Sequence, residues 1–175
     1  GHLALDAGDA LLVGDAVLPT YTPNVGGSDT RLESALSTYL DTIDGLLERF
    51  GADAEGSLDA YPGHGSTVDL PARIRTIRRH HAERVRDAVA ALPEPGDSVT
   101  ATTDDATHPG RTPWAVAVDL FGEMRGIHAK MGAGEAAAHL AFAADSGFAE
   151  RVAEAPDRYA RRVTDRDPEL AIDNL

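Results

Sequence analysis

Two short loops each carry a side chain that can bind a metal, and each loop directly follows a hydrophobic segment. Asp15 comes after the apolar run 10–13, and His64 comes after residues 58–61. A carboxylate can bridge two divalent ions and a neutral imidazole suits zinc, so the pair is chemically sensible as half of a two-metal site. Taken alone, an Asp after a Gly is more often a turn residue, and one His in a Gly-rich loop is more often a surface residue.

The elements that would position these loops can be predicted from hydrophobic periodicity. Residues 3–5 and 10–13 are apolar runs separated by a turn signal at residues 6–9, which predicts a β-hairpin. Residues 58–61 form a short strand that ends in the loop Pro62-Gly63-His64-Gly65. Helices are expected over 32–50 and 71–92, where apolar residues recur at helical spacing.

The sequence after residue 92 has a different organisation. Residues 93–97 contain two prolines and a glycine, and we expect a linker over 93–111. A helix is predicted to start at Thr112-Pro113 and to run to about Gly126, with Trp114 and Met124 on its buried side. A second helix is expected over 134–146, followed by one or two small strands within 148–162.

Composition excludes several classes of protein. The chain has no cysteine, so a metal would need His, Asp and Glu ligands. It contains no apolar run of about 20 residues and no signal-peptide pattern, so we expect a cytoplasmic protein. The formal charge of −13 repels nucleic acid and anionic membrane. Lys130 is the only lysine among 16 basic residues, which fits a halophilic source or, equally, a GC-rich genome.

Several segments together resemble metallo-β-lactamase-fold hydrolases. Their order and spacing match the later motifs of that family, and they cover most of residues 1–92. Two further segments resemble the branch with glyoxalase-II-like and ribonuclease-like members and a winged-helix tail. The family motifs are matched by Gly1-His2-Leu3-Ala4-Leu5, Leu12-Val13-Gly14-Asp15-Ala16-Val17-Leu18-Pro19 and Tyr61-Pro62-Gly63-His64-Gly65, and the branch by Thr22-Pro23-Asn24 and Arg79-His80-His81-Ala82-Glu83-Arg84.

The resemblance implies an α/β fold of the αββα type and a set of roles. Residues 1–92 would be the C-terminal half of a metallo-β-lactamase-like domain, and residues 112–175 a winged-helix-like helical tail. Asp15 would bridge two zinc ions, and His64 would be a terminal ligand of one of them. The nucleophile would be a metal-bound water, so no side chain is assigned that role. The expected substrate is a thioester, a lactone or a related ester.

The family's H-x-H-x-D-H motif, which supplies most of the metal ligands, has no counterpart here. Two side chains cannot satisfy two zinc ions, each of which takes about four ligands. We therefore expect a fragment of a longer hydrolase, inactive alone, or a chain whose missing half comes from another polypeptide. A fragment would expose a sheet edge and a core face, and should self-associate. His2 is expected to support the site, with direct metal binding as the alternative.

Other polar residues receive weaker assignments. His80 and Arg84 resemble residues near the site in similar proteins and are candidates for substrate contact. His81 lies on an apolar stripe, so a hydrogen-bonded packing role is expected, while His108, His128 and His139 are expected to be loop, structural or surface residues. The carboxylates of Asp119, Glu123 and Glu135 are expected on a solvated face.

The tail raises a rival function, nucleic-acid binding. Residues 134–146 contain no Arg or Lys, which a recognition helix needs, and Glu135 and Asp145 would repel phosphates. We expect the tail to pack against the catalytic domain, to shape its cleft or to mediate dimerisation. Two alternatives to an ester hydrolase remain: a phosphodiester (RNA) hydrolase of the same fold, and a non-catalytic interaction module.

Overall fold

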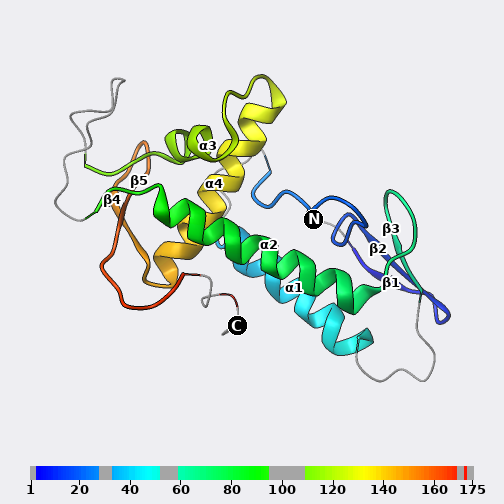
Figure 1. The fold of residues 1–175 in the computed structure, drawn as a ribbon. Helices are drawn as coiled ribbons and strands as arrows, with labels where there is room; N and C mark the ends of the chain where they lie inside the picture. The colour runs from blue at the N-terminus through cyan, green and yellow to red at the C-terminus, as the bar shows by residue number, and fades with distance from the viewer. Residues whose placement is uncertain (1–2, 28–32, 52–58, 95–108, 169–171, 173–175) are drawn as a thin grey trace. The chain divides into compact units, whose positions relative to one another are not determined.

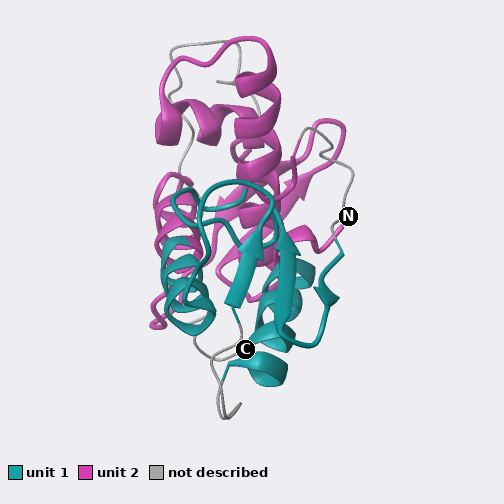
Figure 2. Ribbon diagram, turned by 90° about the vertical axis from the view of Figure 1, so that its right-hand side faces the viewer, with its two compact units in different colours: residues 1–23, 37–80 teal, residues 24–36, 81–175 magenta. Residues whose placement is uncertain are grey.

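The structure, a computed structural model, describes residues 3–27, 33–51, 59–94, 109–168 and 172. Figure 1 shows the order of its helices and strands. The chain divides into two compact units, coloured separately in Figure 2. Unit 1 comprises residues 1–23 and 37–80, and unit 2 comprises residues 24–36 and 81–175.

Unit 1 contains a sheet of three strands in the order β1-β2-β3. Strand β1 (Leu5–Asp6) pairs antiparallel with β2 (Ala10–Gly14), which confirms the predicted hairpin. At its turn the amide of Gly8 donates to the Asp6 carboxylate at 3.0 Å. Strand β3 (Asp59–Pro62) pairs parallel with β2, so the carboxyl ends of β2 and β3 lie at the same edge of the sheet.

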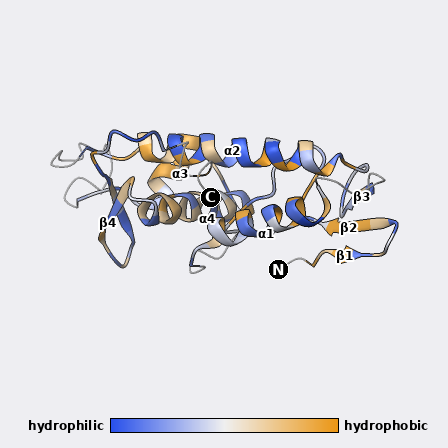
Figure 3. Cartoon of the chain, turned by 90° about the horizontal axis from the view of Figure 1, so that it is seen from below, coloured by the Kyte–Doolittle hydropathy of each residue, from blue (hydrophilic) through white to orange (hydrophobic). Residues whose placement is uncertain are grey.

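Unit 1 also contains most of one helix and the first half of another. They are α1 (Ala35–Phe50), of which residues 37–50 belong to this unit, and α2 (Leu70–Ala90), of which residues 70–80 belong to it. An ion pair between Arg78 and Asp44 joins them. Both helices are amphipathic, and Figure 3 shows α2 alternating between hydrophobic and hydrophilic residues. The fully buried side chains of unit 1 include Val13, Val17, Leu40, Ile43, Ala60, Ile74 and Ile77.

One face of the sheet is apolar and exposed. In the register of the strands Leu5 lies opposite Leu12, and Leu12 lies opposite Tyr61. Their exposed fractions are 59%, 45% and 43%, whereas their neighbours Leu11, Val13 and Ala60 are buried on the other face. We call Leu5, Leu12 and Tyr61 the apolar row. A row of this kind is a feature of surfaces that associate with another apolar surface.

Unit 2 consists of the end of α2, two further helices and a hairpin. Helix α3 (Pro113–Phe121) begins with Thr112, whose hydroxyl accepts from the amide of Ala115 at 3.1 Å. Helix α4 (Ile127–Asp145) is followed by the antiparallel strands β4 (Ala149–Ala153) and β5 (Arg158–Arg161). The prediction of one or two small strands within 148–162 is therefore confirmed, with two strands observed.

Two predictions about these helices are wrong. Helix α3 ends at Phe121 because Gly122 adopts a φ of 74°, so Met124 lies outside it, and Trp114 is exposed. Helix α4 starts seven residues before the predicted Gly134. Its interior glycines are sites of close packing, because a Cβ would collide with the Met124 sulfur at Gly132 and with the Gly27 carbonyl at Gly134. Gly132 and Gly134 thus mark close contacts inside α4, whereas Gly126 precedes its start.

No helix in the described part of the chain combines the length and the hydropathy needed to cross a membrane.

Candidate metal centre

The parallel pairing of β2 and β3 brings the two predicted metal ligands together. Asp15 directly follows Gly14, the last residue of β2, and His64 is separated from the end of β3 by Gly63. The two strand ends are neighbours, because Gly14 is the register partner of Pro62. The distance from Asp15 Oδ1 to His64 Nε2 is 3.7 Å. The His64 side chain is 81% exposed and that of Asp15 is 38% exposed, so both are open to solvent.

The two loops that carry these residues are in direct contact. The amide of Gly63 donates to the carbonyl of Gly14 at 2.9 Å, which extends the strand pairing into the loops. A Cβ on Gly63 would lie 2.5 Å from Asp15 Oδ1, so the carboxylate lies against the backbone of the His64 loop. The Asp15 carboxylate therefore occupies the space that a side chain at position 63 would take.

The second glycine of the loop Pro62-Gly63-His64-Gly65 has a different function. Gly65 has a φ of 86°, in the left-handed region that favours glycine. A Cβ at this position would also lie 2.6 Å from Cγ of Pro19, which belongs to the Asp15 loop. The turn after His64 is thus fitted closely against the proline that ends the Asp15 loop.

Two side chains from the helices hold the Asp15 loop from its other side. The Tyr39 hydroxyl of α1 donates to the Ala16 carbonyl at 2.8 Å, and Arg73 Nε of α2 donates to the Leu18 carbonyl at 2.5 Å. Burial raises the pKa of Tyr39 well above its ordinary value, while the nearby positive charge of Arg73 opposes part of that shift. Tyr39 therefore stays protonated and remains a donor.

The chemistry of the two donors fits part of a zinc site. With metal–ligand bonds of about 2.0–2.2 Å, two ligand atoms on one tetrahedral zinc lie about 3.4 Å apart. The observed separation of 3.7 Å between Asp15 Oδ1 and His64 Nε2 is close to this value. Among the described residues, no group of three or more His, Asp or Glu side chains is placed to hold a metal ion. The pair supplies two ligands, and a complete centre needs further ones.

The remaining predicted site residues lie in different surroundings. His2 is outside the described residues. His80 is half-buried on α2 and belongs to unit 1. Arg84 belongs to unit 2, where its Nε lies 3.5 Å from the Glu135 carboxylate and its guanidinium lies 4.6 Å from the centre of the Phe121 ring. The roles of His80 and Arg84 in substrate contact stay predictions.

The expectation that Glu135 lies on a solvated face is wrong. Its side chain is only 16% exposed, and its carboxylate accepts from Asn24 Nδ2 at 2.8 Å and pairs with Arg84. Burial raises the pKa of Glu135, and Arg84 and Asn24 offset part of the effect. Since Asn24 is 111 residues away in sequence, no local pattern indicates this contact.

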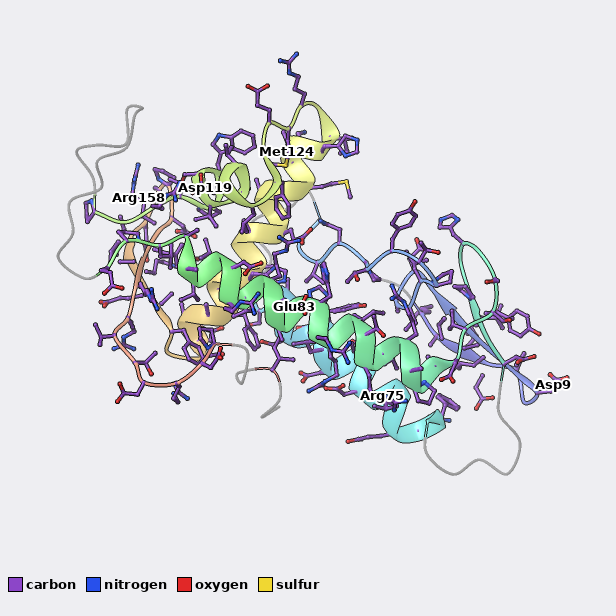
Figure 4. All side chains as sticks on the ribbon, viewed as in Figure 1. Asp9, Arg75, Glu83, Asp119, Met124 and Arg158 are labelled. Carbon is purple, nitrogen blue, oxygen red and sulfur yellow. The ribbon has the colours of Figure 1, made fainter. Side chains whose placement is uncertain are left out.

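Glu135 also lines a cavity of about 670 Å³ within unit 2. Phe121, Met124 and Met131 contribute apolar surface to it, and His128 contributes an exposed imidazole. Figure 4 labels Met124 in the segment between α3 and α4. The cavity thus combines apolar walls with a carboxylate.

Two other histidines form a buried pair. The predicted packing role of His81 is confirmed: it is 1% exposed, and its Nδ1 lies 3.0 Å from Nε2 of His139. His139 is fully buried, and its Nδ1 lies 2.7 Å from the Glu135 carbonyl oxygen. These imidazoles are packed into unit 2 and are not exposed as metal ligands.

Comparison with solved structures identifies the fold. The chain is similar to a metallo-β-lactamase family protein from Thermus thermophilus, with 26% sequence identity and a TM-score of 0.64 over 88% of this chain and 42% of that one. It is also similar to a β-lactamase domain protein from Burkholderia ambifaria, with 25% identity and a TM-score of 0.66 over 92% of this chain and 44% of that one. No protein-family model and no curated protein sequence matches the chain.

These similarities support the predicted fold, a metallo-β-lactamase fold of mixed helices and strands. These neighbours support a superfamily of hydrolase type. The chain spans less than half the length of either solved structure.

Proposed function

We propose that this chain contributes Asp15 and His64 to the zinc centre of a hydrolase that cleaves a thioester, a lactone or a related ester. The observation that carries the proposal is the 3.7 Å separation of Asp15 Oδ1 and His64 Nε2 at the shared edge of β2 and β3. The similarity to metallo-β-lactamase family proteins supports the same class of reaction.

The two residues have distinct parts in the proposal. The Asp15 carboxylate would hold zinc through its oxygens, and the His64 imidazole would hold it through a ring nitrogen. Zinc, when bound, lowers the pKa of water to about 7 and polarises a carbonyl, which permits attack at neutral pH. Both side chains are open to solvent, which gives a substrate access. The proposal assigns the remaining ligands to residues outside the described part of the chain or to another polypeptide.

The proposal includes a non-catalytic role for unit 2. Its order of α3, α4, β4 and β5 supports a winged-helix-like appendage of the glyoxalase-II-like branch. The part of α4 from Gly134 to Asp145 carries no Arg or Lys, which argues against nucleic-acid binding through that part of the helix. We infer that unit 2 shapes the substrate cleft or mediates dimerisation.

Zinc titration of the product of the complete gene, in which the remaining ligands are supplied, tests the metal assignment. We expect the wild-type protein to bind zinc, and Asp15→Ala and His64→Ala each to weaken this binding by removing one of its donors. His128→Ala is the matched control, because His128 is an exposed histidine of unit 2. If the Asp15 and His64 variants bind zinc as tightly as the wild type, the assignment is wrong.

Turnover is tested with the product of the complete gene, assayed with zinc against thioesters, lactones and phosphodiesters. We expect ester or thioester hydrolysis that Asp15→Asn abolishes. Cleavage of the phosphodiester alone would favour an RNA hydrolase of the same fold. A zinc-loaded protein that hydrolyses none of these substrates would instead be an interaction module.

A further inference from the structure

Gly63 does not have the positive φ that favours glycine. In this it differs from Gly65, whose φ is 86°. A Cβ on Gly63 would lie 3.4 Å from the Gly14 carbonyl carbon and 3.5 Å from Asp15 Cγ, which are ordinary contacts. Its only close approach would be to Asp15 Oδ1, at 2.5 Å. The missing side chain at position 63 therefore makes room for one carboxylate oxygen.

The rest of the Asp15 loop is held in place around this oxygen. Tyr39 and Arg73 donate to the carbonyls of Ala16 and Leu18, and the Gly63 amide donates to the Gly14 carbonyl. Backbone groups on both sides of Asp15 are thus hydrogen-bonded. A clash at Oδ1 would be relieved by rotation of the Asp15 side chain, because the loop that carries it is fixed at several points.

We infer that Gly63 is a positioning residue, which allows the Asp15 carboxylate to lie beside His64 before a metal binds. The inference rests on the proposed function, since it concerns the same pair of ligands. To reach an ordinary contact distance of 3.4 Å from the Cβ of an alanine at this position, Oδ1 must retreat by about 0.9 Å from its present 2.5 Å. Metal affinity depends on such orientation, and loss of a supporting partner typically costs about 10–100-fold.

The test is Gly63→Ala in the product of the complete gene, titrated with Zn²⁺ alone. We expect zinc affinity to fall by about 10–100-fold, with little change in thermal stability, because the end of one flexible side chain can move aside. A merely structural role would lower the unfolding temperature and leave zinc affinity unchanged. Gly45→Ala is the matched control, since Gly45 lies inside α1 and a Cβ there meets nothing within 4 Å.

A double-mutant cycle with Asp15→Ala separates this inference from the proposed function. If Gly63 acts through Asp15, Gly63→Ala has no further effect on zinc affinity in the Asp15→Ala background. If Asp15→Ala weakens zinc binding and Gly63→Ala does not, the positioning role is wrong and the metal assignment stands. If Asp15→Ala leaves zinc binding unchanged, the metal assignment itself fails.

A crystal structure of the metal-free Gly63→Ala variant decides the positioning role even where zinc binding is lost. We expect Asp15 Oδ1 to have moved away from position 63, so that its distance to His64 Nε2 differs from the present 3.7 Å. An unchanged carboxylate beside His64 in that structure would overturn the inference.

Discussion

His81 Nδ1 lies 3.0 Å from His139 Nε2 in unit 2, and the two imidazole rings are stacked with their centres 5.2 Å apart. The second nitrogen of His139 determines which atom donates. His139 Nδ1 lies 2.7 Å from the Glu135 carbonyl oxygen, which can only accept, so Nδ1 carries a proton. In the neutral ring Nε2 is then the acceptor, and the proton between the two rings belongs to His81 Nδ1.

Long-range ¹H–¹⁵N spectra of the histidine side chains check this assignment. We expect both His81 and His139 to be present as the Nδ1–H tautomer at neutral pH. The exposed His128 serves as the internal reference, because no packing fixes its tautomer. A His139 signal typical of the Nε2–H form would contradict these hydrogen-bond directions.

The raised pKa of Glu135 implies that the unfolding free energy of the protein depends on pH in a specific way. Burial raises its folded-state pKa above the ordinary 4.5, so the folded protein holds this proton more tightly than the unfolded chain does. The stabilisation from this group is complete below about pH 4.5 and is lost as pH rises through the folded pKa. Glu135→Gln has no proton to lose, and its unfolding free energy should lack this decline.

Urea unfolding of the wild type and of Glu135→Gln across the acid-to-neutral range measures the effect. The stability of the wild type relative to the variant should decrease as pH rises. Glu123→Gln is the control, since Glu123 is exposed and should follow the wild type at every pH. A constant difference between the wild type and Glu135→Gln would show that Glu135 has the same pKa in both states.

The parts of the candidate site that depend on local sequence could be predicted. The apolar runs at residues 3–5 and 10–13 and the segment 58–61 predict the strands of the sheet, and Asp15 and His64 follow the ends of two of these strands. Parallel pairing then brings the carboxyl ends of β2 and β3 together. Only the motif resemblance, and no periodicity, indicated that these two loops belong to one site.

The parts that depend on contacts distant in sequence could not be predicted. An isolated carboxylate on a helix, such as Glu135, is expected to face solvent, whereas Asn24 and Arg84 reach it from other segments. Gly134 was expected to start a helix, but it lies inside α4, where Gly27 packs closely against it. In each case a neighbour distant in the chain determines the environment of the residue.

Tyr39 offers a test of the hydrogen bonds that hold the Asp15 loop. Tyr39→Phe keeps the ring and removes the donor to the Ala16 carbonyl, now at 2.8 Å. We expect a loss of about 0.5–1.5 kcal/mol in unfolding free energy, together with weaker zinc binding, because the loop that carries Asp15 becomes less fixed. Tyr21→Phe, at an exposed position, should change neither quantity. Unchanged stability in Tyr39→Phe would show that this hydrogen bond is not maintained in solution.

Because the apolar row is exposed, we expect the isolated chain to self-associate through it. Leu5, Leu12 and Tyr61 present adjacent apolar surface on one side of the sheet, and burying it against a second apolar surface gains about 25 cal/mol per Å². Leu5→Thr/Leu12→Thr introduces β-branched residues suited to strands while making this face polar. We expect sedimentation velocity to show concentration-dependent association of the wild type that the double variant reduces. Val163→Thr removes an exposed apolar residue elsewhere in the chain and should associate like the wild type. Equal association of all three proteins would exclude the apolar row as the contact surface.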